Sequence, residues 1–175
     1  VGAAERLRRL RDAPMPEIPI QVERAVEWVE KTKQIELSPE QRDVISTAIN
    51  AKVMVITGGP GAGKTTVLNS LLEILAVKGV SMLLAAPTGR AAKRMENATG
   101  RPAATLHRLL EFSPKTGRFT RDPERPLDTD LLVIDESSML DIVLFHNTLR
   151  ALPPEARLIL VGDVDQLPSV GPGNV

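Results

Sequence analysis

The segment VMVITGGPGAGKTTVLNSLL, residues 53–72, constrains the fold more than any other stretch of the chain. A short β-branched apolar run is followed by a glycine-rich turn and then by a helix-forming run. Gly58, Gly63, Lys64 and Thr65 fit the pattern G-x-x-x-x-G-K-[ST]. In this context the pattern predicts a phosphate-binding loop between a buried strand and a helix. The alternative is a glycine-rich turn that merely caps an ordinary helix.

The same order of strand and helix continues along the chain. Further apolar runs stand at 81–86, 131–135 and 158–162. Helix-like segments occupy roughly 39–50, 64–78, 88–98, 104–111 and 138–151. The apolar runs are continuous rather than alternating, which predicts an α/β domain with a mainly parallel sheet covered by helices on both faces. Ligands of such sheets bind beyond the carboxyl ends of the strands.

The first 36 residues differ from the rest. Residues 1–12 favour a short basic helix, 13–20 are proline-rich, and a packing helix is expected over about 20–33. We therefore expect an N-terminal helical and linker segment over 1–36 and one domain over 37–175. Within that domain, Phe112 and Phe119 flank SPKTGR and predict a small hairpin excursion.

Charge and composition narrow the classes of function. The net charge is zero, but residues 88–125 carry nine Lys and Arg against four Asp and Glu, and residues 126–175 carry two against eight. The basic groups could face a polyanion, and the acids could bind a divalent cation. Such charge blocks are, however, often simply solvated faces of a protein. Without cysteine, neither a disulfide nor a thiolate metal site is available. No apolar run approaches a membrane span, so a cytoplasmic protein is expected.

The loop after residue 57 is expected to bind ATP with Mg²⁺. Glycine allows the backbone N–H groups to turn toward phosphate, and the following helix adds its positive end. Lys64 would contact the β- and γ-phosphates, and the Thr65 hydroxyl would ligate Mg²⁺. The candidate nucleotide-binding residues of the loop are Gly58, Gly59, Pro60, Gly61, Ala62, Gly63, Lys64, Thr65 and Thr66.

The apolar run LLVI at 131–134 ends in Asp135 and Glu136. Asp135 can hold Mg²⁺ through water, and Glu136 is placed to polarise an attacking water molecule. A kinase must keep water away from the γ-phosphate, so the adjacent acids favour hydrolysis over small-molecule phosphorylation.

Two further motifs can be explained either by local structure or by nucleotide binding. In LSPEQ, residues 37–41, Ser38 and Gln41 fit a capping box, which local sequence favours over recognition of adenine by the Gln41 amide. Asp163 and Gln166 follow the run at 158–162. The neutral amide of Gln166 could sense the γ-phosphate, or both residues could simply be solvated residues of a turn.

Taken in chain order, the motifs resemble the conserved blocks of superfamily 1 DNA helicases, most closely the RecD-like branch that includes the alpha subunit of exodeoxyribonuclease V. The blocks are LSPEQ, GGPGAGKTT, AAPTGRAAKRM, TLHRLL, VIDESSMLD and VGDVDQLPSVGPG, and the resemblance spans about residues 37–175. It implies a RecA-like first motor domain. In that domain Gln41 reads adenine, Lys64, Thr65, Asp135 and Glu136 form the ATPase centre, and Gln166 senses the γ-phosphate.

The resemblance also implies contacts with single-stranded DNA. They would involve Thr88, Gly89 and Arg90 in one block, and Thr105 and His107 in the next. Hydroxyls and helix N-termini suit phosphate oxygens. His107 could instead be an interior histidine, and Lys93 and Arg94 further along are expected to be solvated.

The family pattern includes a second RecA-like domain that supplies arginine fingers, and we expect the 175 residues to be a fragment without it. The resemblance implies an ATP-dependent helicase or translocase with 5′-to-3′ polarity, acting with recombination or repair subunits. The alternative is an ATP-gated switch that binds or loads DNA without unwinding it.

Overall fold

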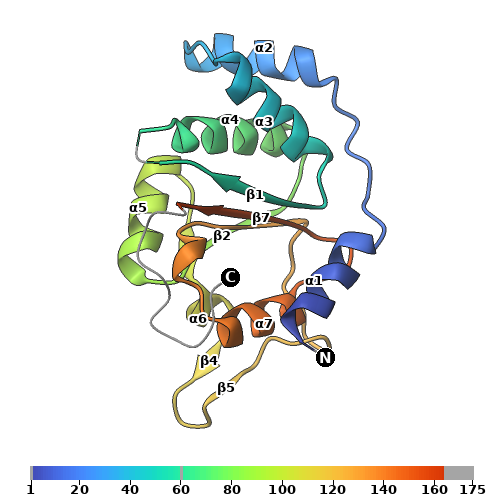
Figure 1. Ribbon diagram of the computed structural model, residues 1–175, viewed down its shortest axis with the longest axis vertical. Coiled ribbons are helices and arrows are strands. Elements are labelled where there is room, and N and C mark those ends of the chain that lie inside the picture. Colours follow the sequence, from blue (N-terminus) through green and yellow to red (C-terminus); the bar gives the residue numbers. More distant parts are fainter. Residues whose placement is uncertain (1, 60, 164–175) are drawn as a thin grey trace.

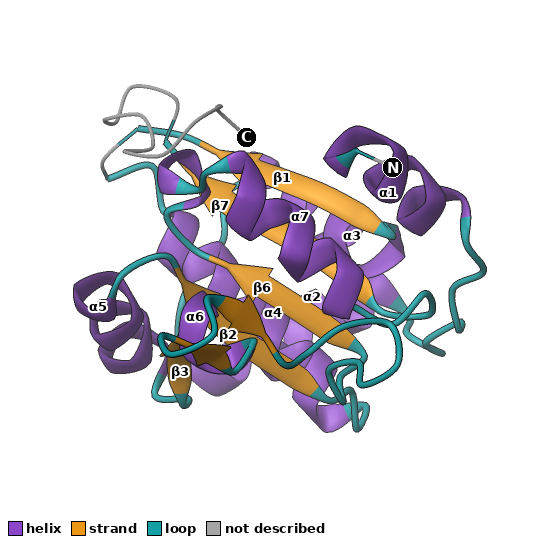
Figure 2. Ribbon diagram, turned by 90° about the horizontal axis from the view of Figure 1, so that it is seen from below, coloured by secondary structure: helices purple, strands orange, loops and turns teal. Residues whose placement is uncertain are grey.

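The computed structural model of the chain describes residues 2–59 and 61–163. Its centre is a five-stranded sheet in which every neighbouring pair of strands is parallel. The strands are β1 (Val53–Thr57), β2 (Met82–Ala86), β3 (Ala103–Thr105), β6 (Leu131–Ile134) and β7 (Arg157–Gly162). They lie in the order β1-β7-β6-β2-β3, as Figure 2 shows. The predicted α/β fold with a mainly parallel sheet is confirmed.

Helices cover both faces of this sheet (Figure 1). One face carries α2 (Val22–Lys33), α3 (Pro39–Asn50) and α4 (Lys64–Val77), and the other carries α1 (Ala3–Asp12), α6 (Leu106–Leu109) and α7 (Ile142–Ala151). Helix α5 (Gly89–Thr99) packs against β2 and β3. Each face has its own core of buried apolar side chains. Fully buried members include Ile45, Leu71, Leu75, Leu106, Leu140 and Leu158.

Two of the expected elements differ in the structure. Residues 103–105 form strand β3 beside β2, whereas a helix was expected to begin at 104. The sequence Ala-Ala-Thr has no strand signal of its own, and its pairing with Leu84–Ala86 supplies the order. The helix expected over 138–151 begins at Ile142, because a 3₁₀ turn, η1 (Ser137–Met139), comes first. Asp141 then caps α7 by accepting a hydrogen bond of 2.8 Å from the Leu144 N–H.

The expected hairpin is present. Strands β4 (Phe112–Ser113) and β5 (Arg118–Phe119) pair antiparallel, with Phe112 opposite Phe119. No helix in the described parts of the chain is long and apolar enough to cross a membrane.

The proline-rich residues 13–20, here called the strap, connect α1 to α2 across the amino end of the sheet (Figure 1). Two buried cations hold it. Lys52 Nζ donates to the carbonyl oxygens of Pro14 at 3.2 Å and Pro154 at 2.6 Å. The Arg157 guanidinium donates to the carbonyls of Pro16, at 3.1 Å, and Ile49. Burial lowers the pKa of both Lys52 and Arg157. Their hydrogen bonds to the Pro14 and Pro16 carbonyls tie the strap to the domain.

Candidate nucleotide-binding and DNA-binding site

The candidate residues gather at the carboxyl edge of the sheet. The register pairs Thr57 at the end of β1 with Gly162 at the end of β7, and Ile134 of β6 with Leu160. Because all five strands are parallel, the segments that follow them emerge on one side. The predicted phosphate-binding loop, α5, α6, the Asp135-Glu136 pair and Asp163 are these segments.

The loop after β1 leads directly into α4. The N-cap of α4 is Gly63, which has φ of 76° and no side chain to cap the helix. The first-turn N–H groups of a helix have no intrahelical partner and lie at its positive end, which suits a phosphate. Gly63 also has a steric role, because a Cβ built on it would collide with the Gln41 amide nitrogen. These features fit a nucleotide phosphate group; Pro60 of the loop lies outside the described residues.

Lys64 lies with its ammonium inside the loop. Its Nζ donates to the carbonyl oxygen of Gly58 and, at 3.3 Å, to that of Gly59. Backbone carbonyls are exchangeable partners for an ammonium on a half-buried, flexible stem. Thr65 is exposed beside it, so its hydroxyl is accessible to a metal ion.

Gln41 makes the capping box that the local sequence favours. Its Oε1 accepts from the Ser38 N–H at 2.9 Å, and Ser38 Oγ accepts from the Gln41 N–H at 3.2 Å. The same amide presents Nε2 to Gly63 of the loop. The cap therefore uses the oxygen and leaves the amide N–H₂ at the nucleotide-binding loop, where its role with adenine stays a prediction.

Asp135 and Glu136 follow β6 in an unusual backbone conformation. Glu136 has φ of 54° and ψ of 39°, a left-handed conformation that costs a residue with a side chain roughly 1–2 kcal/mol. Asp135 Oδ1 accepts from the Glu136 N–H at 2.8 Å and fixes this turn. Glu136 is buried, and strained residues of this kind cluster at functional sites. Asp163 is buried after β7, and Gln166 lies outside the described residues.

The predicted DNA contacts begin two helices. Thr88 caps α5 by accepting from the Ala91 N–H at 3.2 Å, and Thr105 caps α6 by accepting from the Arg108 N–H at 3.2 Å. A hydroxyl that accepts one hydrogen bond keeps its own O–H donor for a phosphate oxygen. Gly89 and Arg90 are exposed. Their contacts with DNA stay predictions.

His107 is exposed, so it is not an interior histidine. Its ring meets the ring of Phe112 edge-on, with centroids 5.4 Å apart, and lies 5.8 Å from that of Phe119. The hairpin thus packs against the second predicted DNA-binding block.

Sequence reasoning missed the partner of Arg94. This residue was expected to be solvated, and its side chain is indeed 66% exposed, but its guanidinium pairs with the Glu136 carboxylate. The spacing of four residues from Arg90 places both arginines on one face of α5, which is the signal the sequence contained.

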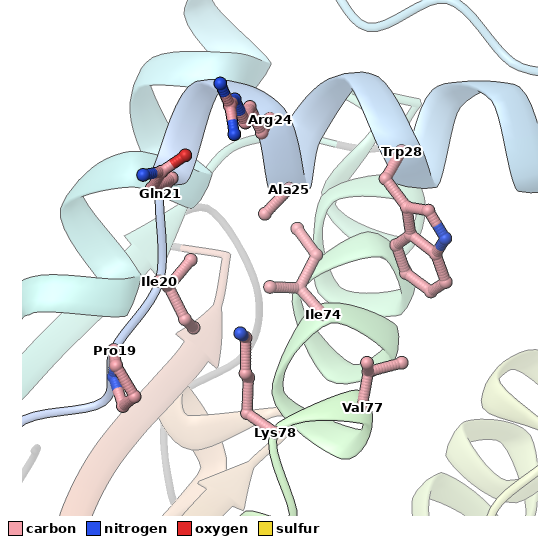
Figure 3. Close-up of a pocket in the computed structure, with 9 residues that line it drawn as sticks. All are labelled: Pro19, Ile20, Gln21, Arg24, Ala25, Trp28, Ile74, Val77 and Lys78. Atoms are coloured by element: carbon pink, nitrogen blue, oxygen red, sulfur yellow. The ribbon is translucent and has the colours of Figure 1, made fainter.

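A hollow of about 450 Å³ lies at the other end of α4, between that helix and α2 (Figure 3). Trp28, Ile74, Val77 and Lys78 line it together with Ile20. With 14 residues at about 1.5 Å each, α4 separates it from Lys64 by about 20 Å. The hollow is therefore distinct from the candidate site.

Comparisons with known proteins agree with these features. A family model described as an AAA domain matches residues 41–172. The chain is 42% identical over 148 residues to the ATP-dependent RecD2 DNA helicase of Deinococcus radiodurans, covering 84% of this chain and 20% of that protein. It is 40% identical over 160 residues to the RecBCD enzyme subunit RecD of Mycolicibacterium smegmatis, covering 78% and 29%.

Solved structures of helicases also match this chain. The Pif1 helicase of Candida albicans matches with a TM-score of 0.61 and 29% identity, over 78% of this chain and 34% of that chain. Bacteroides Pif1 bound to single-stranded DNA matches with a TM-score of 0.55 and 30% identity, with the same coverage. The chain spans less than a third of the length of the RecD2 and RecD relatives named above.

Proposed function

Because the chain belongs to the RecD-like branch of the superfamily 1 DNA helicases, within the AAA domain family, we propose that it is the RecA-like first motor domain of an ATP-driven DNA helicase. The observation that carries the proposal is the meeting of three groups at one edge of the sheet. These are the phosphate-binding loop, the acids after β6, and the capped starts of α5 and α6.

In this proposal the nucleotide lies over the start of α4. Lys64 leaves the carbonyls of Gly58 and Gly59 and binds the β- and γ-phosphates, and the Gln41 amide contacts adenine. Thr65 and Asp135 would hold Mg²⁺, which neutralises phosphate charge when bound. Glu136 accepts the proton of the attacking water. Gln166 is proposed as the γ-phosphate sensor on the basis of the family resemblance.

The DNA strand is proposed to cross the starts of α5 and α6. Strands β2 and β3 are neighbours, so the helices that follow them present Thr88 and Thr105 side by side. The hydroxyls, the exposed Arg90 and His107, and the backbone at Gly89 would contact phosphate and sugar rather than base edges. We propose single-stranded DNA bound with little sequence preference and moved with 5′-to-3′ polarity.

The complete motor requires a second RecA-like domain in the proposed parent protein. Arginine fingers from such a domain are typically worth about 10³ to 10⁵ in rate. We therefore propose that the 175 residues alone bind nucleotide weakly and hydrolyse it slowly. Recombination or repair subunits are proposed as partners, since RecD relatives are named as subunits of the RecBCD enzyme.

Steady-state ATP turnover by the full-length protein, with and without oligothymidylate, tests the proposal. We expect DNA to stimulate turnover and Glu136→Gln to reduce it by about 10² to 10⁴, the usual contribution of a general base. Glu155→Gln is the matched control, because Glu155 is an exposed acid two residues before a strand at the opposite end of the sheet. Turnover that ignores DNA, or an unimpaired Glu136→Gln variant, would contradict the proposal.

A further inference from the structure

The ion pair between Arg94 and Glu136 joins the two halves of the proposed site. Arg94 lies on α5, the helix proposed to receive DNA, and Glu136 is the proposed base for hydrolysis. The two residues are 42 positions apart in the sequence. Their meeting at the carboxyl edge depends on the pairing of β2 with β6.

The order of the strands indicates the side of β6 on which Arg94 holds the Glu136 carboxylate. Strand β7 lies between β1 and β6, so the loop after β1 and the turn after β6 are separated by two strand spacings, about 10 Å. Strand β2, which leads into α5, lies on the opposite side of β6. Arg94 therefore draws the Glu136 carboxylate away from the phosphate-binding loop and toward the proposed DNA path.

Pairing also occupies the carboxylate. One of its oxygens accepts a hydrogen bond from the Arg94 guanidinium, so that oxygen is not available to an attacking water molecule. Glu136 is held with its side chain 11% exposed, so few other partners can replace Arg94 there.

Arg94 itself remains accessible. Its side chain is 66% exposed, and it lies one helical turn beyond Arg90 on the same face of α5. A guanidinium binds phosphate through two parallel hydrogen bonds, so a DNA phosphate is a strong competitor for it. A strand that contacts Arg90 passes close to Arg94.

We propose that Arg94 is a positioning residue that couples DNA binding to ATP hydrolysis. Without DNA, it holds Glu136 on the α5 side of β6. When a DNA phosphate takes the guanidinium, the carboxylate is released and can face the nucleotide. This inference rests on the proposed function and adds the residue through which DNA would stimulate turnover.

The chain provides a matched control in the preceding residue. Lys93 is also on α5, has a side chain 67% exposed, and pairs with a glutamate, Glu96, at 2.7 Å. Glu96 lies on the same helix and has no place in the proposed chemistry. Lys93→Ala therefore removes a comparable surface cation without touching Glu136.

The first experiment measures ATP turnover by the full-length protein as a function of oligothymidylate concentration. Arg94→Ala is expected to raise DNA-free kcat about two- to fivefold, the scale of a partly exposed ion pair, with KM for ATP unchanged. Turnover at saturating DNA should stay the same, so the stimulation ratio falls. Arg94→Lys, which can still pair with Glu136, should keep DNA-free turnover near wild type, as should Lys93→Ala.

The second experiment measures DNA binding without nucleotide, by fluorescence anisotropy over a range of salt concentrations. Coupling is reciprocal, so Glu136→Gln should bind oligothymidylate about two- to fivefold more tightly, while Glu155→Gln should not. Arg94→Ala should reduce the slope of log affinity against log salt by about 0.7, the loss of one phosphate contact.

The outcomes separate this inference from the proposed function. Wild-type turnover that ignores DNA overturns both. If DNA stimulates the wild type, an unchanged stimulation ratio in Arg94→Ala, or an equal fall of turnover with and without DNA, overturns the role of Arg94 alone. Unchanged DNA affinity in Glu136→Gln overturns it as well.

Discussion

The two ends of the parallel sheet use the same chemical groups in different ways. At the amino end, the Lys52 ammonium donates to the carbonyls of Pro14 and Pro154, and at the carboxyl end the Lys64 ammonium donates to those of Gly58 and Gly59. Lys52 is 8% exposed, whereas Lys64 is only half-buried and lies in a glycine-rich loop. The two lysines therefore make the same kind of hydrogen bond, but they differ in how deeply they are buried.

The arginines repeat this contrast. Arg157 is 5% exposed and donates to the carbonyls of Ile49 and Pro16, while the Arg94 side chain is 66% exposed and pairs with Glu136. A buried cation tied to fixed carbonyls has no other partner to adopt, so it stabilises the strap. An accessible cation can exchange its partner for a phosphate. Burial, rather than residue type, therefore separates the structural cations Lys52 and Arg157 from Lys64 and Arg94, for which we propose functional roles.

Among the variants that test this contrast between cations, Lys64→Met has the largest expected effect, a loss of ATP turnover. Removing one group that stabilises developing charge typically costs about 10² to 10³ in kcat, and we expect a loss of that size in the full-length protein. The change should leave hydrogen exchange of the sheet amides as it is. If Lys64→Met instead accelerated exchange and spared turnover, the contrast between the two lysines would be wrong.

The next effect is that of Arg157→Met on stability. It leaves the buried carbonyl of Ile49 and the part-buried carbonyl of Pro16 without their donor, which costs about 1–3 kcal/mol. Hydrogen exchange of the β1 and β7 amides in the full-length protein should report this loss, while DNA-stimulated turnover persists. Arg94→Met provides the comparison, with no more than about 1 kcal/mol lost. Equal losses of stability in the two variants would contradict the proposed difference between the buried Arg157 and the exposed Arg94.

The smallest effect concerns two glycines at the two ends of α4. Gly63 and Gly79 have similar left-handed backbones, with φ of 76° and 73°, but only a Cβ on Gly63 would meet another group, the Gln41 amide. Gly63→Ala and Gly79→Ala should each cost about 1–2 kcal/mol of backbone strain. Only Gly63→Ala should also weaken ATP binding, measured by fluorescent-nucleotide titration. Equal nucleotide affinity in both variants would contradict a contact between Gln41 and the nucleotide.

Sequence reasoning found what depends on local signals. Short motifs with a local physical basis predict the loop at 58–65, the acids at 135 and 136, the cap at Ser38 and the start of a helix at Thr88. The strand at 103–105 was missed because its order comes from pairing with β2.

The long-range contacts could not be predicted for a related reason. Lys52 and Pro154 are 102 residues apart, and Arg94 and Glu136 are 42 apart. Nothing in either local sequence specifies the partner, because the order of strands in the sheet brings them together. The sequence therefore predicts candidate site residues, and the fold shows how these residues are connected.

In the proposed function, the carboxyl edge of this sheet belongs to a motor that moves along DNA. Displacement of streptavidin from biotinylated single strands by the full-length protein tests for such movement. We predict ATP-dependent displacement from the 3′ end, faster than from the 5′ end, and its loss in Glu136→Gln. DNA binding that responds to ATP without displacement from either end would contradict the claim and favour an ATP-gated switch.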